Sequence, residues 1–129
     1  MAKAKILKIP YNRCSFAEVE TDAEGRIPLA TMQSLVGGYI ERYPLRGHGL
    51  DGLDLIIDEE GKLKRLTVNP PATVLSGIQS LGDGRLSMDF IAGEAFVCGN
   101  DEDGYSVGLT AEQEAALRKR LAELQIRIY

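Results

Sequence analysis

The sequence has no tryptophan, a single histidine and only two cysteines among its 129 residues. The cysteines, Cys14 and Cys98, lie far apart, and the histidine is His48. Neither a Cys-x-x-Cys nor a paired-histidine spacing can therefore occur, which excludes the common structural zinc motifs. Two isolated cysteines are typical of a protein in a reducing compartment. We expect reduced thiols and predict no metal and no cofactor.

Long hydrophobic runs and strong charge are also lacking. No apolar run approaches the roughly 20 residues that span a bilayer, and the N-terminal residues lack the apolar core of a secretory signal. The net charge is −4, without the basic stripe of a nucleic-acid binder. These absences predict a cytoplasmic protein with neither a membrane nor a nucleic-acid partner. The chain is long enough for one domain, residues 1–129, that buries its own core.

Short segments with alternating or continuous apolar residues predict β-strands. Residues 53–58 are almost all apolar, which indicates a central strand covered on both faces. Residues 58–62 are expected to form a hairpin loop, with Gly61 in the left-handed conformation. The predicted strands are residues 5–9, 16–21, 39–45, 53–58, 63–66, 85–91 and 94–99.

Two segments have helical periodicity and clear end signals. Residues 28–36 carry an apolar stripe that stops at Gly37, a residue suited to the left-handed end of a helix. Residues 110–128 begin with Thr110 and Gln113, the spacing of a capping box, and continue with a leucine-rich stripe. Between them, Asn69-Pro70-Pro71 is expected to block regular structure, residues 72–79 to make a turn or two of helix, and residues 80–84 to form a loop.

Together these elements predict an α+β fold. It consists of a mostly antiparallel sheet of about five or six strands, with one short helix and one longer C-terminal helix packed on it.

The glycine-rich segment 47–52 matches the pattern G-x-G-x-x-G. The dinucleotide-binding motif requires a helix after this pattern, whereas a strand is predicted here. We therefore expect a loop between strands, in which Arg46 and His48 could hold an anion. Tyr39, Glu41 and Tyr43 share one face of the preceding strand, as in a recognition surface or a half-buried sheet. No catalytic residue is predicted, and the predicted ligand- or partner-binding residues are Tyr39, Glu41, Tyr43, Arg46, His48 and Asn69.

Two other patterns have some features of a functional site. Aligning Gly104 with the invariant glycine of a calcium loop places Gly99 and Thr110 where acidic ligands are required, so a solvated acidic turn is expected instead. Cys14 lies in a polar stretch and is expected to be the more accessible cysteine, whereas Cys98 lies in an apolar strand and is expected in the core.

Several short runs, taken in order along the chain, carry a family resemblance. They are Val36-Gly37-Gly38-Tyr39-Ile40-Glu41, residues 58–63, Asn69-Pro70, residues 89–93 and residues 109–113. In this order they resemble a family of small proteins, a domain of unknown function carried mainly by bacteriophages, plasmids and other bacterial mobile elements. The likeness spans residues 6–117, and residues 46–52 and 69–85 look like additions to a shorter core. The resemblance implies a bacterial cytoplasmic setting and brings no established activity.

Three classes of function follow as hypotheses. The first is a non-enzymatic phage or mobile-element accessory protein that binds a host defence protein or a small signalling molecule. The second is a small enzyme that uses Cys14 or a carboxylate pair near the loop at 46–52. The third is a nucleic-acid-associated protein with a local basic patch at Lys62, Lys64 and Arg65, beside Arg46. A homodimer could form through an exposed sheet edge or the C-terminal leucine stripe.

Overall fold

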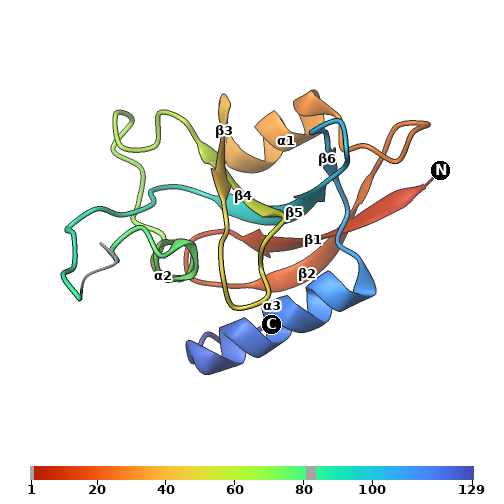
Figure 1. The fold of residues 1–129 in the computed structure, drawn as a ribbon. Helices are drawn as coiled ribbons and strands as arrows, with labels where there is room; N and C mark the ends of the chain where they lie inside the picture. Colours follow the sequence, from red (N-terminus) through yellow and green to blue (C-terminus); the bar gives the residue numbers. More distant parts are fainter. Residues whose placement is uncertain (1, 81–83) are drawn as a thin grey trace.

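The computed structural model describes residues 2–80 and 84–129, and residues 81–83 of the predicted loop lie outside this range. Figure 1 shows one sheet with helices on both of its faces. Within the described residues the sheet has six strands in the order β2-β1-β5-β4-β3, with β6 paired to β5, and all pairs are antiparallel. This is the predicted α+β fold. The strands are β1 (Lys3–Ile9), β2 (Ser15–Glu20), β3 (Ile40–Pro44), β4 (Leu53–Asp58), β5 (Ala95–Asn100) and β6 (Ser106–Val107).

The central strands separate two hydrophobic cores. All six residues of β4 are buried, as expected for a strand covered on both faces. Leu55 and Val97 pack in one core, whereas Ile56 and Phe96 pack in the other. This follows from the period of two in a strand, which sends neighbouring side chains to opposite faces.

Helix α1 (Leu29–Val36) covers one face of the sheet. Its Met32 and Val36 belong to the core that contains Phe96. Gly37 ends the helix with φ of 84°, which confirms the predicted left-handed terminator. Pro28 occupies the N-cap and does not lie inside the first turn.

Helix α3 (Ala111–Glu123) covers the opposite face. Thr110 and Gln113 form the predicted capping box. Leu117 and Leu121 are fully buried against the sheet. Because Leu117 and Leu121 are buried in the core of the protein, this part of the leucine stripe cannot form a homodimer interface.

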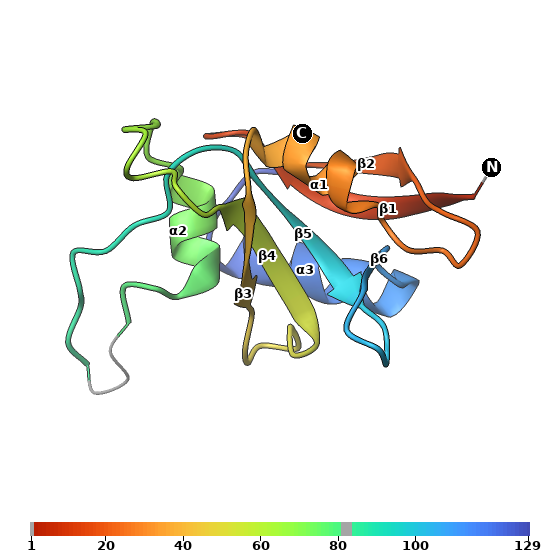
Figure 2. The ribbon, with the colours of Figure 1, turned by 90° about the horizontal axis from the view of Figure 1, so that it is seen from above.

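A third helix, α2 (Pro70–Ser76), begins where the sequence predicted a break. Asn69 is the N-cap, and the two prolines take the first helical positions, where a backbone N–H has no intrahelical partner to lose. Figure 2 shows α2 at the side of the sheet. The prolines therefore start this helix, and the prediction that they block regular structure is wrong.

Residues 63–66 are not a strand, so the predicted hairpin is also wrong. The chain coils after Asp58 through successive turns, with Lys64 N–H donating to Glu60 O and Leu66 N–H to Gly61 O. Gly61 does not have a positive φ, and Arg65 adopts the left-handed conformation instead. A Cβ on Gly61 would lie 2.4 Å from Ala92 O. The glycine is thus required for close approach of two backbone segments.

The alternating segment 85–91 is likewise not a strand. Leu86 and Met88 are 77% and 92% exposed, so the alternation does not mark a buried face. The Ser87 and Asp89 side chains accept hydrogen bonds from the backbone N–H groups of Asp89 and Phe90. Such local bonds compete with sheet pairing.

Candidate functional site

Three of the predicted binding residues line one cavity, which we call the arginine pocket. Tyr43, Arg46 and His48 form one wall, and Arg120 of α3 contributes from another side. The volume is about 780 Å³, within the range of small-molecule sites. The lining residues are Tyr43, Pro44, Arg46, His48, Leu50, Val74, Leu75, Ser76, Gly77, Ser80 and Arg120.

The charge of the arginine pocket is one-sided. Its lining contains two guanidinium groups and an imidazole but no carboxylate, although the chain as a whole carries a net charge of −4. Among the described residues Arg46 has no ion-pair or hydrogen-bond partner. Arg120 lies 3.6 Å from the Glu123 carboxylate, a long and partly exposed ion pair. The Arg46 guanidinium is thus free to receive an anion, and the Arg120 guanidinium is held only by this one long ion pair.

Strand β3 aims Tyr43 at this pocket. Tyr43 is paired with Leu55 of β4, so its side chain lies on the sheet face that α3 covers. The ring is half-buried against the core on that side. β3 is an edge strand, and Pro44 at its end lacks a backbone N–H. A proline at an exposed edge discourages pairing with a further strand.

The loop at 46–52 is built from left-handed residues. Gly47, His48, Gly49 and Gly52 have φ values of 72°, 55°, 78° and 90°. Leu50 is buried and anchors the loop, and its N–H donates to Gly47 O at 2.9 Å. The loop joins β3 to β4, which confirms the inter-strand loop and leaves no helix N-terminus for a dinucleotide phosphate.

The same loop lies against α3. A Cβ on Gly49 would be 3.5 Å from the Ala116 Cβ. Ala116 and Arg120 are four residues apart on the helix, so they share a face. The Arg120 guanidinium therefore lies on the side of α3 that faces Arg46 and His48.

The other predicted residues lie elsewhere. Glu41 lines a second cavity of about 220 Å³, which shares the Tyr43 wall and also contains Asp58 and Glu59. Tyr39 precedes β3, is 66% exposed and lines a hollow near Lys64. Asn69 is fully buried, and its amide donates to Ile9 O at 2.8 Å and to Gly93 O at 2.9 Å. The side chain of Asn69 is thus occupied by the fold.

Sequence reasoning missed Arg120 and Ser76. Arg120 lies next to Leu121 and three residues after Leu117, at the margin of the buried stripe. This position could have been read from the sequence as a candidate, because a long cationic side chain at the edge of an apolar stripe extends over the surface beside the helix. Ser76 gave no signal, since the start of α2 was misassigned.

Neither thiol is suited to nucleophilic catalysis. Cys14 is fully buried, so the prediction of an accessible thiol is wrong, and burial raises its pKa to about 11. Cys98 is buried as expected, and burial raises its pKa to about 12. A buried thiol with a raised pKa stays protonated near neutral pH and is a poor nucleophile.

The basic patch of the third hypothesis is largely neutralised. Lys62 forms an ion pair with Asp89, and Lys64 pairs with the buried Asp58 at 2.6 Å. These lysines hold the turns after β4 in place. Phosphate binding requires cations that are free to replace counterions, and here two of the three are committed to carboxylates.

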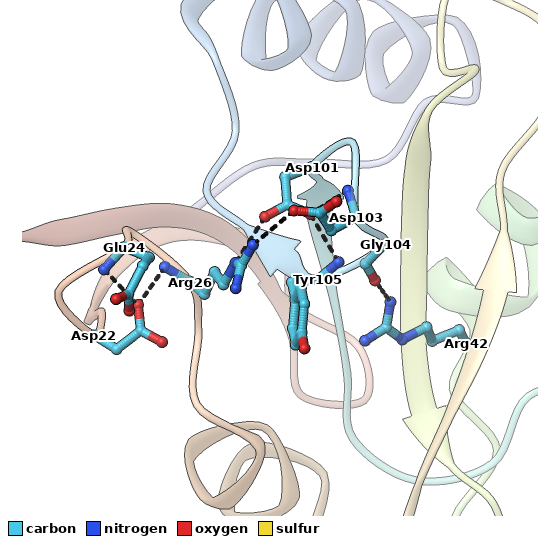
Figure 3. A network of polar contacts seen from close by, with 8 residues as sticks. All are labelled: Asp22, Glu24, Arg26, Arg42, Asp101, Asp103, Gly104 and Tyr105. Atoms are coloured by element: carbon cyan, nitrogen blue, oxygen red, sulfur yellow. Dashed lines mark hydrogen bonds and ion pairs between the residues drawn. The ribbon is translucent and has the colours of Figure 1, made fainter.

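A second charged cluster also serves the fold (Figure 3). The Arg26 Nε lies 2.9 Å from Asp101 Oδ2, and its Nη2 lies 3.0 Å from Asp103 Oδ2. The guanidinium stacks over the Tyr105 ring at 3.9 Å, and Arg42 donates to Gly104 O from the other side. The acidic turn is thus bound to two distant segments by arginines. The part of the chain that the structure describes contains no group of carboxylates, histidines and cysteines arranged to hold a metal ion.

The lowered pKa values of two carboxylates, Asp101 and Glu114, predict that the fold loses stability in acid. Partial burial raises the pKa of Asp101, but hydrogen bonds from Tyr105 N–H and Arg26 outweigh it and leave the pKa low. Hydrogen bonds from Lys5 and Arg118 lower the pKa of Glu114. A lowered pKa in the folded state stabilises the fold above the unfolded value of about 4, and this stability is lost as the pH falls further.

We therefore expect the urea midpoint to be steady near neutral pH and to fall below about pH 4. An Arg26→Gln variant should lose less stability over the same interval, because Asp101 loses its partner. The exposed Arg65→Gln serves as the control and should follow the wild type. A midpoint that does not fall below pH 4, or falls equally in wild type and Arg26→Gln, would contradict this assignment.

Comparison with known proteins gives one match. The model of the family DUF3846, described as a domain of unknown function, matches residues 3–122. No curated protein and no solved structure matches the chain. The predicted resemblance to a domain of unknown function is confirmed at that level. None of the described helices is long and apolar enough to cross a membrane.

Proposed function

The chain belongs to the DUF3846 family, a domain of unknown function, and we propose that it binds a small anionic molecule in the arginine pocket. One observation carries this proposal. Arg46, His48 and Arg120 line a single cavity of about 780 Å³ that has no carboxylate in its lining. Clustered guanidinium groups inside a concave, partly apolar site attract anions and raise their local concentration.

A concave site of this kind favours a small molecule over a protein surface. In the setting that the family resemblance suggested, the protein is an accessory of a bacteriophage or another mobile element. It acts in the bacterial cytoplasm by sequestering a small signalling molecule. No catalytic step is part of the proposal, since both thiols are buried. Binding to a host defence protein remains the alternative within the same class.

Isothermal titration calorimetry tests the proposal with a panel of charged and uncharged compounds. Inorganic phosphate, citrate and adenosine 5′-monophosphate are expected to bind, whereas adenosine and spermidine are not. Affinity should fall as salt is added, because exposed charges are screened over about 10 Å at 0.1 M salt.

A matched pair of variants locates the binding. Arg120→Gln should weaken anion binding about tenfold or more, a loss of roughly 1.4 kcal/mol. Lys119→Gln removes the same charge from the exposed neighbouring position and should bind like the wild type. If no anion binds, or if anions and adenosine bind equally, the proposal is wrong.

A further inference from the structure

His48 is held in a conformation that the fold does not require of a histidine. Its φ of 55° lies in the left-handed region, which carries a cost for every residue with a Cβ. Gly47 and Gly49 on either side take the same conformation without this cost. A glycine at position 48 would make the same turn.

Nothing else in the fold accounts for this side chain. His48 is exposed, and among residues 2–80 and 84–129 its ring has no hydrogen-bond or ion-pair partner. What the imidazole does is line the arginine pocket beside Arg46. Residues in strained backbone conformations cluster at functional sites.

The donors of the pocket approach from different directions. Arg46 and His48 come from the loop between β3 and β4, whereas Arg120 comes from α3. One guanidinium is enough to satisfy a planar carboxylate with two parallel hydrogen bonds. Three donors from two separate elements exceed what a single carboxylate needs and fit a tetrahedral group with more oxygens.

The charge and the volume of the pocket narrow the ligand further. A phosphate monoester carries about −1.5 to −2 charge at pH 7, which matches two guanidinium groups better than a single carboxylate does. The cavity is far larger than a phosphate, and its remaining walls include Pro44, Leu50 and Val74. The ligand therefore has an organic part that lies against apolar side chains.

Resting on the proposed anion binding, we propose that the ligand is a phosphate monoester and that His48 is the residue that selects it over a carboxylate. The imidazole N–H is the third donor, placed by the left-handed backbone. The two arginines supply most of the attraction for any anion. His48 supplies the preference for a phosphate over a carboxylate.

The test compares adenosine 5′-monophosphate with adenosine 5′-carboxylic acid, which share the ring and differ in the acidic group. Calorimetry on the wild type should show a preference for the phosphate of tenfold or more. His48→Gly should reduce that preference to less than threefold while leaving the thermal midpoint unchanged or higher. Arg65→Gly removes the strain of a left-handed residue that lies outside the pocket, and this variant should keep the full preference for the phosphate.

His48→Asn is the second variant, because asparagine tolerates the left-handed conformation. It should also lose the preference, since the shorter amide does not reach as far as an imidazole. If either folded variant keeps the wild-type preference, or if the wild type binds both compounds equally, His48 does not select the ligand, although anion binding in the pocket would stand. If the wild type binds neither compound, both proposals fail.

Discussion

Replacing Asn69 with alanine is expected to reduce the free energy of unfolding by about 3–5 kcal/mol. The side chain is fully buried and bridges three segments of the chain. Its amide donates to Ile9 O and Gly93 O, and its Oδ1 accepts from Ala72 N–H at 3.1 Å. Alanine would leave two carbonyl groups without these donors in the core and remove the cap of α2.

Asn100→Ala provides a matched control for Asn69→Ala. The Asn100 amide also donates two hydrogen bonds, to Gly52 O at 3.2 Å and to Asp54 Oδ2 at 3.1 Å, but the residue is exposed. Water can take the place of the exposed Asn100 amide, so we expect a loss of about 1 kcal/mol or less. Urea unfolding of both variants measures the difference. Equal losses would contradict the structural role assigned to Asn69.

The second large effect is expected in ligand binding. Reversing both charges of the arginine pocket, with Arg46→Glu and Arg120→Glu together, should weaken the binding of adenosine 5′-monophosphate more than 100-fold, about 2.7 kcal/mol. Each guanidinium would otherwise make charge-assisted hydrogen bonds to the anion. The reversed pair would also repel it.

The fold should tolerate this double change. Arg46 has no ion-pair partner among the described residues, and the Arg120 partner is distant at 3.6 Å. Substitution of the exposed Arg46 should change stability by only about 0.5 kcal/mol, whereas Arg120 is partly buried and its substitution costs more. Arg65→Glu with Lys119→Glu makes the same change in net charge outside the pocket and should retain most of the affinity. A similar loss in both double variants would mean that net charge, and not the pocket, governs binding.

Local sequence signals predicted the elements whose ends are set by local chemistry. Thr110 with Gln113 located the start of α3, and Gly37 located the end of α1. The continuous apolar run in β4 predicted a strand buried on both sides. In each case the interaction lies within a few residues, so that the sequence carries the whole signal.

Elements that depend on distant contacts were predicted wrongly. Asn69 stabilises the start of α2 through Ile9, which is 60 residues away. The turns after β4 depend on the close approach of Gly61 to Ala92. Residues 63–66 lie within these turns and pair with no strand among the described residues. Such long-range contacts override local propensity.

The candidate site was predicted in part for the same reason. Tyr43, Arg46 and His48 are close in sequence, and reading the glycine-rich loop placed them together. Arg120 is contributed by α3, which packs on the same sheet face from the end of the chain. Only the tertiary fold brings these residues into one cavity.

The central claim is that a small anion binds in the arginine pocket. Backbone amide NMR during titration with adenosine 5′-monophosphate tests it most directly, because each signal reports one position. We predict saturable shifts in residues 46–52 and in Ser76 and Gly77, with little change in the hairpin of β1 and β2. No saturable shift, or shifts confined to the acidic turn at residues 101–104 on the opposite face, would contradict the claim.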